Sequence, residues 1–165
     1  METNDLPPIA VFDLDGVIFK SPSPTIIHDL TFWLEYWADS ERQRPNPEMV
    51  KLLHDVSTFS PIVILTARPI SAARDTTMAL ANVGVLVTSN LTTRWHSGIP
   101  TGIHLIMWPL KPDWDAIPHW KQKTVDDLNR MQGVSFVVED HKVNADLIRR
   151  ICPVLLYEAY RGYSS

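Results

Sequence analysis

The 165-residue chain predicts an α/β fold with a doubly wound parallel sheet that helices cover on both faces. Short apolar runs of strand type recur along the chain, and segments with helical spacing of their apolar residues alternate with them. The connections are short, which favours parallel strands joined by right-handed crossovers. Several strand-like runs end directly in polar residues, as is typical where ligands bind at the carboxyl edge of such a sheet.

The first strand is the run IAVF that begins at Ile9, and it leads into two aspartates and a glycine. A run that is apolar on both faces is typical of a central parallel strand. Asp13 and Asp15 are two residues apart, so their carboxylates can face one pocket, while Gly16 permits a sharp exit from the strand. Two neighbouring carboxylates repel each other, and a divalent cation or a retained proton relieves the repulsion. Two aspartates that merely cap loop amides are the alternative interpretation.

The region between the first and second strands predicts two helices. The first follows a proline-broken turn, and its apolar residues recur on one face at Ile26, Leu30, Trp33, Leu34 and Trp37. Its tryptophans either stack on a substrate base or pack over the sheet. The second helix begins with Asn46 as N-cap and Pro47 in the first turn, and it turns Val50, Leu53 and Val56 inward.

The second strand is predicted at residues 61–66, and it delivers Thr66 at its carboxyl end, two residues before Arg68. Ser71 is expected to cap the next helix, which ends at Gly84. The residues of this helix that are predicted to face inward are Ala73, Thr77, Leu80 and Val83.

The second half of the chain continues the alternation. Its predicted strands are residues 85–87, 103–107, 135–138 and 154–157. Residues 90–102 are rich in turn formers and predict an exposed loop. The predicted helices turn inward Val125, Leu128 and Met131 before a stop near Gly133, and Val143, Leu147 and Ile148 after the strand at 135–138. That strand ends in Glu139 and Asp140.

Length and composition fit one globular domain over residues 1–165, with 45% apolar and 21% charged residues. The formal net charge of −4 argues against nucleic-acid binding through overall charge, so any contact with a polyanion must be local. The single cysteine, Cys152, excludes an intrachain disulfide framework. The N-terminal residues lack the pattern of a signal peptide, and no apolar run is long enough to span a bilayer. We therefore expect a cytoplasmic protein with no membrane contact.

The polar strand ends resemble the four motifs of the haloacid dehalogenase (HAD) superfamily of phosphohydrolases, in the same order. DLDGV matches the first motif, ILTAR the second, the lysine of HWKQK the third and VVEDHKVNAD the fourth. The resemblance covers nearly the whole chain. The spacing between the motifs leaves no room for an independent cap domain, so we expect a fairly open site.

The resemblance implies a role for each motif residue. Asp13 would be the nucleophile that forms an aspartyl-phosphate, and Asp15 would be the general acid and base. Thr66 and the third-motif lysine would bind the transferring phosphoryl group. The cofactor would be Mg²⁺, held by the Asp13 carboxylate, the Asp15 main-chain carbonyl and a fourth-motif acid. Arg68 and Lys123 are expected to contact substrate.

Two assignments stay open between neighbouring residues. The third-motif lysine is Lys121 or Lys123, and we favour Lys121 because it directly follows Trp120. The metal-binding acid of the fourth motif is Glu139 or Asp140. We favour Asp140, because a shorter side chain at a strand tip suits the tight octahedral geometry of magnesium.

The expected activity is magnesium-dependent hydrolysis of a phosphomonoester. Residues 103–130 most resemble the 3′-phosphatase domain of polynucleotide kinases, so the expected substrate is the 3′-phosphate of a nucleotide or nucleic acid. The tryptophans that could stack bases are Trp33, Trp37, Trp95, Trp108, Trp114 and Trp120. The alternatives are a 5′-nucleotidase acting on mononucleotides and a non-catalytic binding protein with the HAD fold. The sequence does not indicate an oligomeric state.

Overall fold

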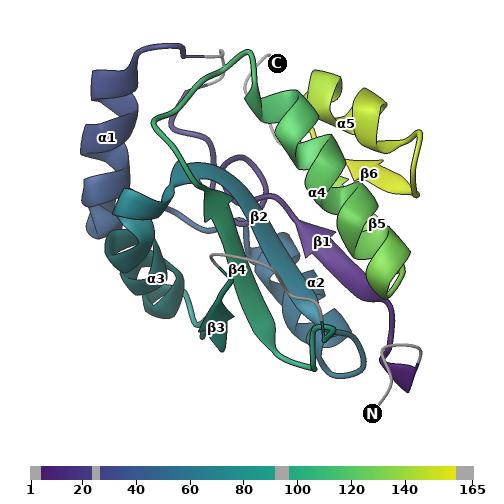
Figure 1. The fold of residues 1–165 in the computed structure, drawn as a ribbon. Coiled ribbons are helices and arrows are strands. Elements are labelled where there is room, and N and C mark those ends of the chain that lie inside the picture. Colours follow the sequence, from purple (N-terminus) through teal and green to yellow (C-terminus); the bar gives the residue numbers. More distant parts are fainter. Residues whose placement is uncertain (1–4, 24–26, 92–96, 159–165) are drawn as a thin grey trace.

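The computed structural model describes residues 5–23, 27–91 and 97–158. Within these residues the strands form a six-stranded parallel sheet in the order β3-β4-β2-β1-β5-β6 (Figure 1). The strands are β1 (Ile9–Phe12), β2 (Ile62–Pro69), β3 (Ser89–Asn90), β4 (Ile103–Trp108), β5 (Val134–Glu139) and β6 (Val154–Leu156). The helices are α1 (Leu30–Ala38), α2 (Pro47–Ser57), α3 (Ala73–Asn82), α4 (Ile117–Met131) and α5 (Lys142–Ile148), with 3₁₀ turns η2 (Ser40–Arg42) and η3 (Ile70–Ala72). The predicted α/β fold class is confirmed.

Strand β1 lies at the centre of the sheet, where the strand order reverses. The chain first places β2, β4 and β3 on one side of β1, and it then crosses to the other side for β5 and β6. In sheets of this kind, ligands bind outside the carboxyl ends of the strands at such a switch point. Asp13, the first residue after β1, lies there.

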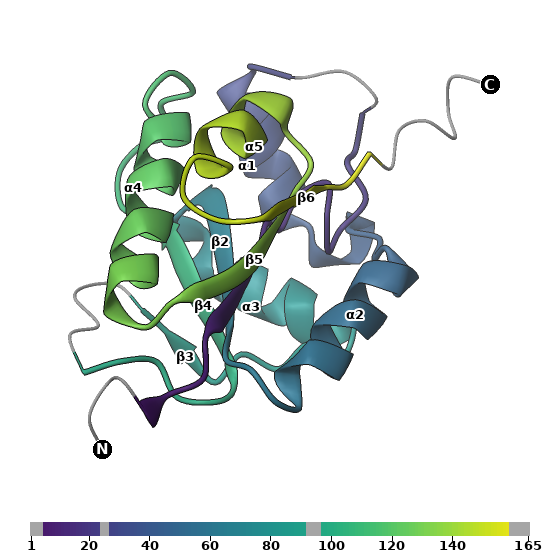
Figure 2. The same ribbon diagram turned by 90° about the vertical axis from the view of Figure 1, so that its right-hand side faces the viewer.

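Both faces of the sheet are covered, and β1 shows why its sequence is apolar throughout. Ala10 and Phe12 belong to a core shared with α2 and α3, whereas Ile9 and Val11 belong to a core shared with α4 and α5. Figures 1 and 2 show these two helical layers on opposite sides of the sheet. A strand that is buried on both faces has no solvent side on which to place polar residues.

The strand predicted at residues 85–87 is not formed. The main-chain N–H of Val85 instead bonds to the carbonyl of Leu80 at the end of α3, and the third strand is the two-residue β3. Val85 is nevertheless fully buried in the core. A short apolar run can therefore be buried without pairing in the sheet.

Three residues predicted to face inward are exposed instead: Leu34, Thr77 and Val143. Leu34 is 46% exposed, and α1 buries Tyr36 and Trp37 in its place. Because α1 is only nine residues long and buries these two residues near its C-terminal end, its apolar stripe does not run along its whole length.

The predicted helix ends are partly confirmed. Asn46 takes the N-cap position of α2, but its side chain donates a hydrogen bond to the Val17 carbonyl (2.8 Å) and does not cap the helix. Ser71 lies exposed within η3, and it does not cap α3 either. Gly84 and Gly133 follow α3 and α4 with φ of 82° and 91°, as a left-handed helix stop requires. Across the described ranges, no helix combines the length and the apolar character needed to cross a bilayer.

Candidate functional site

Polar side chains from β1, β2, β5 and α4 are positioned at the carboxyl edge of the sheet. Asp13 and Asp15 directly follow β1, Thr66 lies in β2, and Glu139 ends β5. Because β1 pairs with both β2 and β5, these three strand ends are neighbours. The first part of α4 adds Lys121. The structure therefore brings together residues from all four sequence motifs.

Lys121 is buried between two carboxylates. Its side chain is 3% exposed, and its Nζ donates to Asp13 Oδ1 (2.8 Å) and to Glu139 Oε2 (3.1 Å). Burial alone would disfavour the ammonium, but the charges of the two carboxylates outweigh it and raise the pKa of Lys121 above its ordinary value. Lys121 is thus a fixed positive charge at the centre of the site.

The two carboxylates that share Lys121 differ in their tendency to ionise. Burial, and then the charge of Glu139, raises the pKa of Asp13 to about 6, although Lys121 acts in the opposite direction. Burial also opposes ionisation of Glu139, but the charge of Lys121 and accepted hydrogen bonds lower the pKa of Glu139 below its ordinary value. Glu139 therefore holds its negative charge more firmly than Asp13 does.

Asp140, which is half-buried, joins the buried Asp13 and Glu139 in a group that we call the acid cluster (Asp13, Glu139 and Asp140). Burial, and then the charges of the other two acids, raises the pKa of Asp140 well above its ordinary value. Its carboxylate lies against Gly16, where a Cβ would lie 1.9 Å from Asp140 Oδ2. Gly16 also has a φ of 85°, which other residues rarely adopt. A glycine is therefore required at this position for the Asp140 carboxylate to fit.

The acid cluster could hold a metal ion, because one carboxylate oxygen from each member lies within 4.8 Å of the others. Both oxygens of Glu139 are already engaged, Oε2 by Lys121 and Oε1 by the main-chain N–H groups of Asp140 and His141. Asp13 and Asp140 are the acids with raised pKa values, so Lys121 alone does not compensate their charges. A hard divalent cation with oxygen ligands fits this donor set and would supply the missing positive charge.

Asp15 is held by a different cation. Arg68 donates to it through two nitrogens, from Nε to Oδ2 (3.0 Å) and from Nη2 to Oδ1 (2.7 Å). This bidentate geometry fixes the carboxylate plane as well as its position. The Asp15 side chain is 21% exposed, whereas the Arg68 side chain is fully buried.

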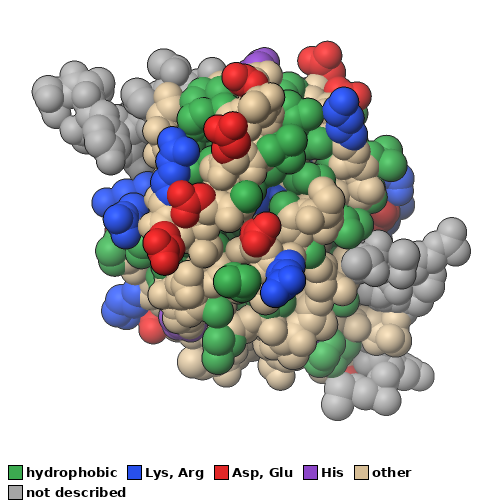
Figure 3. Space-filling model, turned by 90° about the vertical axis from the view of Figure 1, so that its left-hand side faces the viewer, with side chains coloured by type: hydrophobic (Ala, Val, Ile, Leu, Met, Phe, Trp, Pro, Cys, Tyr) green, Lys and Arg blue, Asp and Glu red, His purple; other side chains and the backbone are tan. Residues whose placement is uncertain are grey.

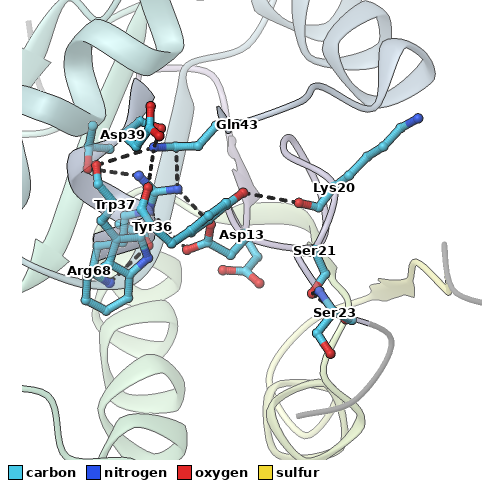
Figure 4. A network of polar contacts seen from close by, with 12 residues as sticks. Asp13, Lys20, Ser21, Ser23, Tyr36, Trp37, Asp39, Gln43 and Arg68 are labelled. Atoms are coloured by element: carbon cyan, nitrogen blue, oxygen red, sulfur yellow. Dashed lines mark hydrogen bonds and ion pairs between the residues drawn. The ribbon is translucent and has the colours of Figure 1, made fainter. Parts of the chain in front are cut away.

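Aromatic rings surround the Arg68 guanidinium. Its Cζ lies 5.5 Å from the ring centroid of Phe19, 5.9 Å from that of Tyr36 and 6.0 Å from that of Trp37. Figure 4 shows Arg68 against the α1 residues Tyr36 and Trp37. Cation–π attraction of this kind favours a buried guanidinium. Arg68, expected from the sequence to contact substrate, therefore faces Asp15 and these rings.

Thr66 and Lys123 occupy different environments. Thr66 is buried, and its Oγ1 accepts the main-chain N–H of Arg68 (3.1 Å), which leaves the hydroxyl proton for another acceptor. Lys123 is 76% exposed on α4 and pairs with Asp127 one turn along the helix (3.1 Å). Lys121 thus lies in the site, whereas Lys123 lies on the solvent side of α4.

A row of rings that sequence reasoning did not assemble joins α1 to the loop before α4. Its members are Trp37, Trp33, Trp114 and His28, with centroids 5.7, 6.4 and 6.1 Å apart in that order. We call this row the aromatic ladder. Its end residue, His28, is exposed, and its charge lowers the pKa of His141, after the larger effects of burial and Lys121. His141 directly follows Asp140, so the His28 end of the ladder acts electrostatically on a residue next to the acid cluster.

The other tryptophans named from the sequence are not part of the ladder. Trp108 is buried and packs edge-on against Trp120, with centroids 5.2 Å apart. Trp95 and Ile26 lie outside the described residues.

Comparison with solved structures finds the same fold in RNA repair proteins, while no protein-family model and no curated protein matches the chain. A chain in the Pnkp1/Rnl/Hen1 RNA repair complex aligns with a TM-score of 0.65 and 17% identity over 94% of this chain and 44% of that chain. A chain in a second Pnkp1/Rnl/Hen1 complex aligns with a TM-score of 0.61 and 18% identity over 92% of this chain and 46% of that chain. This protein therefore spans less than half of each of these two chains, and the likeness supports the fold.

Proposed function

We propose that residues 1–165 form a single HAD-type domain that hydrolyses phosphomonoesters through an aspartyl-phosphate on Asp13. The observation that carries the proposal is the pairing of Asp13 with buried Lys121 beside the acid cluster, at the switch point of the sheet. A carboxylate nucleophile next to a fixed cation suits the attack on a phosphate group, because the cation offsets the negative charge of both reactants.

The reaction begins when a carboxylate oxygen of Asp13 attacks phosphorus and the bond to the leaving oxygen breaks. Asp15 donates a proton to that oxygen, which departs as an alcohol. Asp15 then removes a proton from a water molecule that attacks phosphorus, which releases inorganic phosphate and restores Asp13. Arg68 engages one lone pair on each Asp15 oxygen, so a lone pair on each oxygen remains for proton transfer.

Lys121 and Thr66 bind the phosphoryl oxygens in this mechanism. Lys121 is fixed by two carboxylates, and the Thr66 hydroxyl retains a proton to donate. Arg68 acts by holding Asp15, because it is fully buried and both of its bonds to Asp15 are formed without substrate. Lys123 lies outside this centre, where it can meet only distant phosphates of a long substrate.

Asp13, Asp140 and the main-chain carbonyl of Asp15 would hold a magnesium ion. When bound, Mg²⁺ neutralises charge on the phosphate and draws the acids into their ionised forms. Asp140 is preferred to Glu139 because both Glu139 oxygens already accept hydrogen bonds. Gly16 leaves the space in which the Asp140 carboxylate lies.

The substrate that we propose is the 3′-phosphate of a nucleotide or nucleic acid. Two observations support it: the matched folds come from an RNA repair complex, and the aromatic ladder ends in the exposed ring of His28, whose charge acts on His141 beside Asp140. Base stacking on aromatic residues tolerates any sequence. The face with α1 and α3 mixes acidic, basic and apolar side chains, so it does not present a continuous basic surface to a polyanion (Figure 3). Binding along a strand is thus not favoured on this face.

A substrate panel tests this function. Phosphate release is measured from a 3′-phosphorylated oligonucleotide, a 3′-mononucleotide, a 5′-mononucleotide and a sugar phosphate, with Mg²⁺ and with chelator, and with Asp13→Asn as control. We expect the oligonucleotide to have the highest kcat/KM and the chelator to abolish turnover. A preference for the 5′-mononucleotide would identify a nucleotidase. Absence of turnover on every substrate would favour a non-catalytic binding protein.

A further inference from the structure

Gln43, in the connection between η2 and α2, contacts both Arg68 and the end of α1. Its Oε1 accepts a hydrogen bond from Arg68 Nη2 (2.8 Å). Its Nε2 lies within hydrogen-bond distance of three carbonyl oxygens, those of Tyr36 (3.2 Å), Trp37 (3.3 Å) and Asp39 (3.3 Å). Figure 4 shows Gln43 between the guanidinium and these carbonyls. The side chain is 4% exposed, so water does not substitute for these partners.

The contacts of Gln43 act on the orientation of the guanidinium. Arg68 Nη2 divides its donors between Asp15 and Gln43, and Nη1 donates to Thr76 (3.3 Å). Because the guanidinium is planar, its hydrogen bond to Gln43 restricts how the group can rotate relative to the Asp15 carboxylate. The amide of Gln43 is held in turn by the carbonyls of Tyr36 and Trp37 in the last turn of α1 and by that of Asp39, the residue that follows the helix.

The same end of α1 is tied to the loop that follows Asp15. The Tyr36 hydroxyl donates to the carbonyl of Lys20 (3.3 Å), and the Tyr36 ring lies against the guanidinium. A continuous set of hydrogen bonds thus links the end of α1 to Asp15 through Gln43 and Arg68.

We propose that Gln43 is a positioning residue for Asp15 and that it acts through Arg68. The proposal rests on the phosphatase function argued above. The side-chain hydrogen bonds of Gln43 go to Arg68 and to the end of α1 and not to the acid cluster, so its loss should leave the nucleophile and the metal-binding carboxylates in place. It should instead let the guanidinium turn and displace the proton-transferring carboxyl group. A displacement of about 1 Å in a catalytic group can lower the rate by roughly 100-fold.

The test compares two buried or half-buried glutamines. Gln43→Met removes the amide with little change in volume, and Gln43→Asn keeps an amide that is too short to span the same partners. Gln132 supplies matched controls at the amino ends of the strands, where it bonds Pro7 O (2.7 Å) and both main-chain groups of Ile99 (2.7 and 2.9 Å). Gln132→Met removes three side-chain hydrogen bonds, against four for Gln43→Met, and neither Gln132→Met nor Gln132→Asn touches Arg68.

Two readouts separate a positioning role from a structural one. The first is hydrogen exchange of the Arg68 Nε–H, observed by NMR and assigned with Arg68→Lys, which reports the ion pair whether or not the protein is active. The second is kcat for an alkyl phosphate, whose leaving oxygen needs a proton, against p-nitrophenyl phosphate, whose leaving group needs little help.

We expect both Gln43 variants to speed exchange of the Arg68 Nε–H. They should lower kcat by about 10- to 100-fold for the alkyl phosphate and by much less for p-nitrophenyl phosphate, with KM unchanged. The Gln132 variants should alter neither readout. Equal losses on both substrates, or the same behaviour in the Gln43 and Gln132 variants, would overturn the proposal. An inactive wild-type protein would refute the proposed function, and the Arg68 signal would still decide whether Gln43 holds the ion pair.

Discussion

Replacing Lys121 by methionine should destabilise the protein strongly. The change removes a buried cation from between Asp13 and Glu139 and leaves their carboxylates without a compensating charge. Removing one partner of a buried ion pair typically costs about 3–5 kcal/mol. For a domain of this size, each kcal/mol lowers the unfolding midpoint by about 2–4 °C, so we expect a loss of roughly 6–20 °C.

The control is Lys123→Met, two residues along the same helix. Lys123 pairs with Asp127 on the exposed side of α4, and surface pairs of this spacing contribute only about 0.3–0.5 kcal/mol. Both variants exchange lysine for methionine in α4, so helix propensity is nearly matched. Thermal unfolding followed by circular dichroism, with chelator at about pH 7.5, measures the two midpoints. Equal midpoints in the two variants would refute the assignment of Lys121 as the cation that stabilises the acid cluster.

The pH dependence of the Lys121→Met variant gives a second check. Without the lysine, the pKa of Asp13, already raised to about 6 by burial and by the charge of Glu139, should rise further. The folded variant then binds more protons than the unfolded chain, so its stability increases as pH falls. The deficit relative to wild type should therefore be smaller at about pH 5 than at about pH 7.5. A deficit that is the same at both pH values would contradict this explanation.

Three other perturbations test the metal and substrate assignments. In the metal-free protein the pKa of Asp13 is raised from 3.8 to about 6, so the folded state loses stability as pH rises through that interval. Because Mg²⁺ competes with protons for the acids, it should raise the unfolding midpoint more at about pH 7.5 than at about pH 5.5. A shift of the midpoint that does not depend on pH would oppose a metal site in the acid cluster. Gly16→Ala should abolish the Mg²⁺-dependent rise in the unfolding midpoint, because the new Cβ would collide with Asp140. The control Gly84→Ala has a similar φ of 82° and no atom within 4 Å of the new Cβ, so it should keep that rise. The metal assignment fails if the two variants behave alike in differential scanning fluorimetry. Trp114→Ala should raise KM for a 3′-phosphorylated oligonucleotide by roughly fivefold or more, as expected for the loss of one base stack of about 1–3 kcal/mol. KM for p-nitrophenyl phosphate should not change. Equal changes in KM for the two substrates in steady-state kinetics would argue against a stacking role for Trp114.

The sequence could predict the strand-end residues because each lies directly after, or at the end of, an apolar run. Asp13 and Glu139 lie at neighbouring strand ends for that reason. The sequence could not decide between Lys121 and Lys123 on physical grounds, because two residues along a helix differ by about 200° in direction and either face could be the inner one. The fold distinguishes the two lysines, because Lys121 is buried beside Asp13 and Lys123 is exposed on α4.

The partners of Arg68 could not be read from the sequence. Arg68 lies 53 residues from Asp15 and 25 from Gln43, and a long-range polar contact leaves no periodic pattern in the chain. Val85 was mispredicted as part of a strand because apolar character indicates burial without specifying sheet pairing. The elements follow from local pattern, whereas the polar contacts between them depend on the three-dimensional arrangement.

The most direct test of the central claim is to look for phosphate on Asp13. The Asp15→Asn variant should still react with p-nitrophenyl phosphate in the presence of Mg²⁺, because its leaving group needs little proton transfer, but it should hydrolyse the acyl phosphate slowly. After an acid quench, mass spectrometry of the peptides should find the phosphoryl group on Asp13, and none should be found in an Asp13→Asn control. Substrate turnover with no phosphorylated peptide, or with phosphate on another residue, would contradict the account.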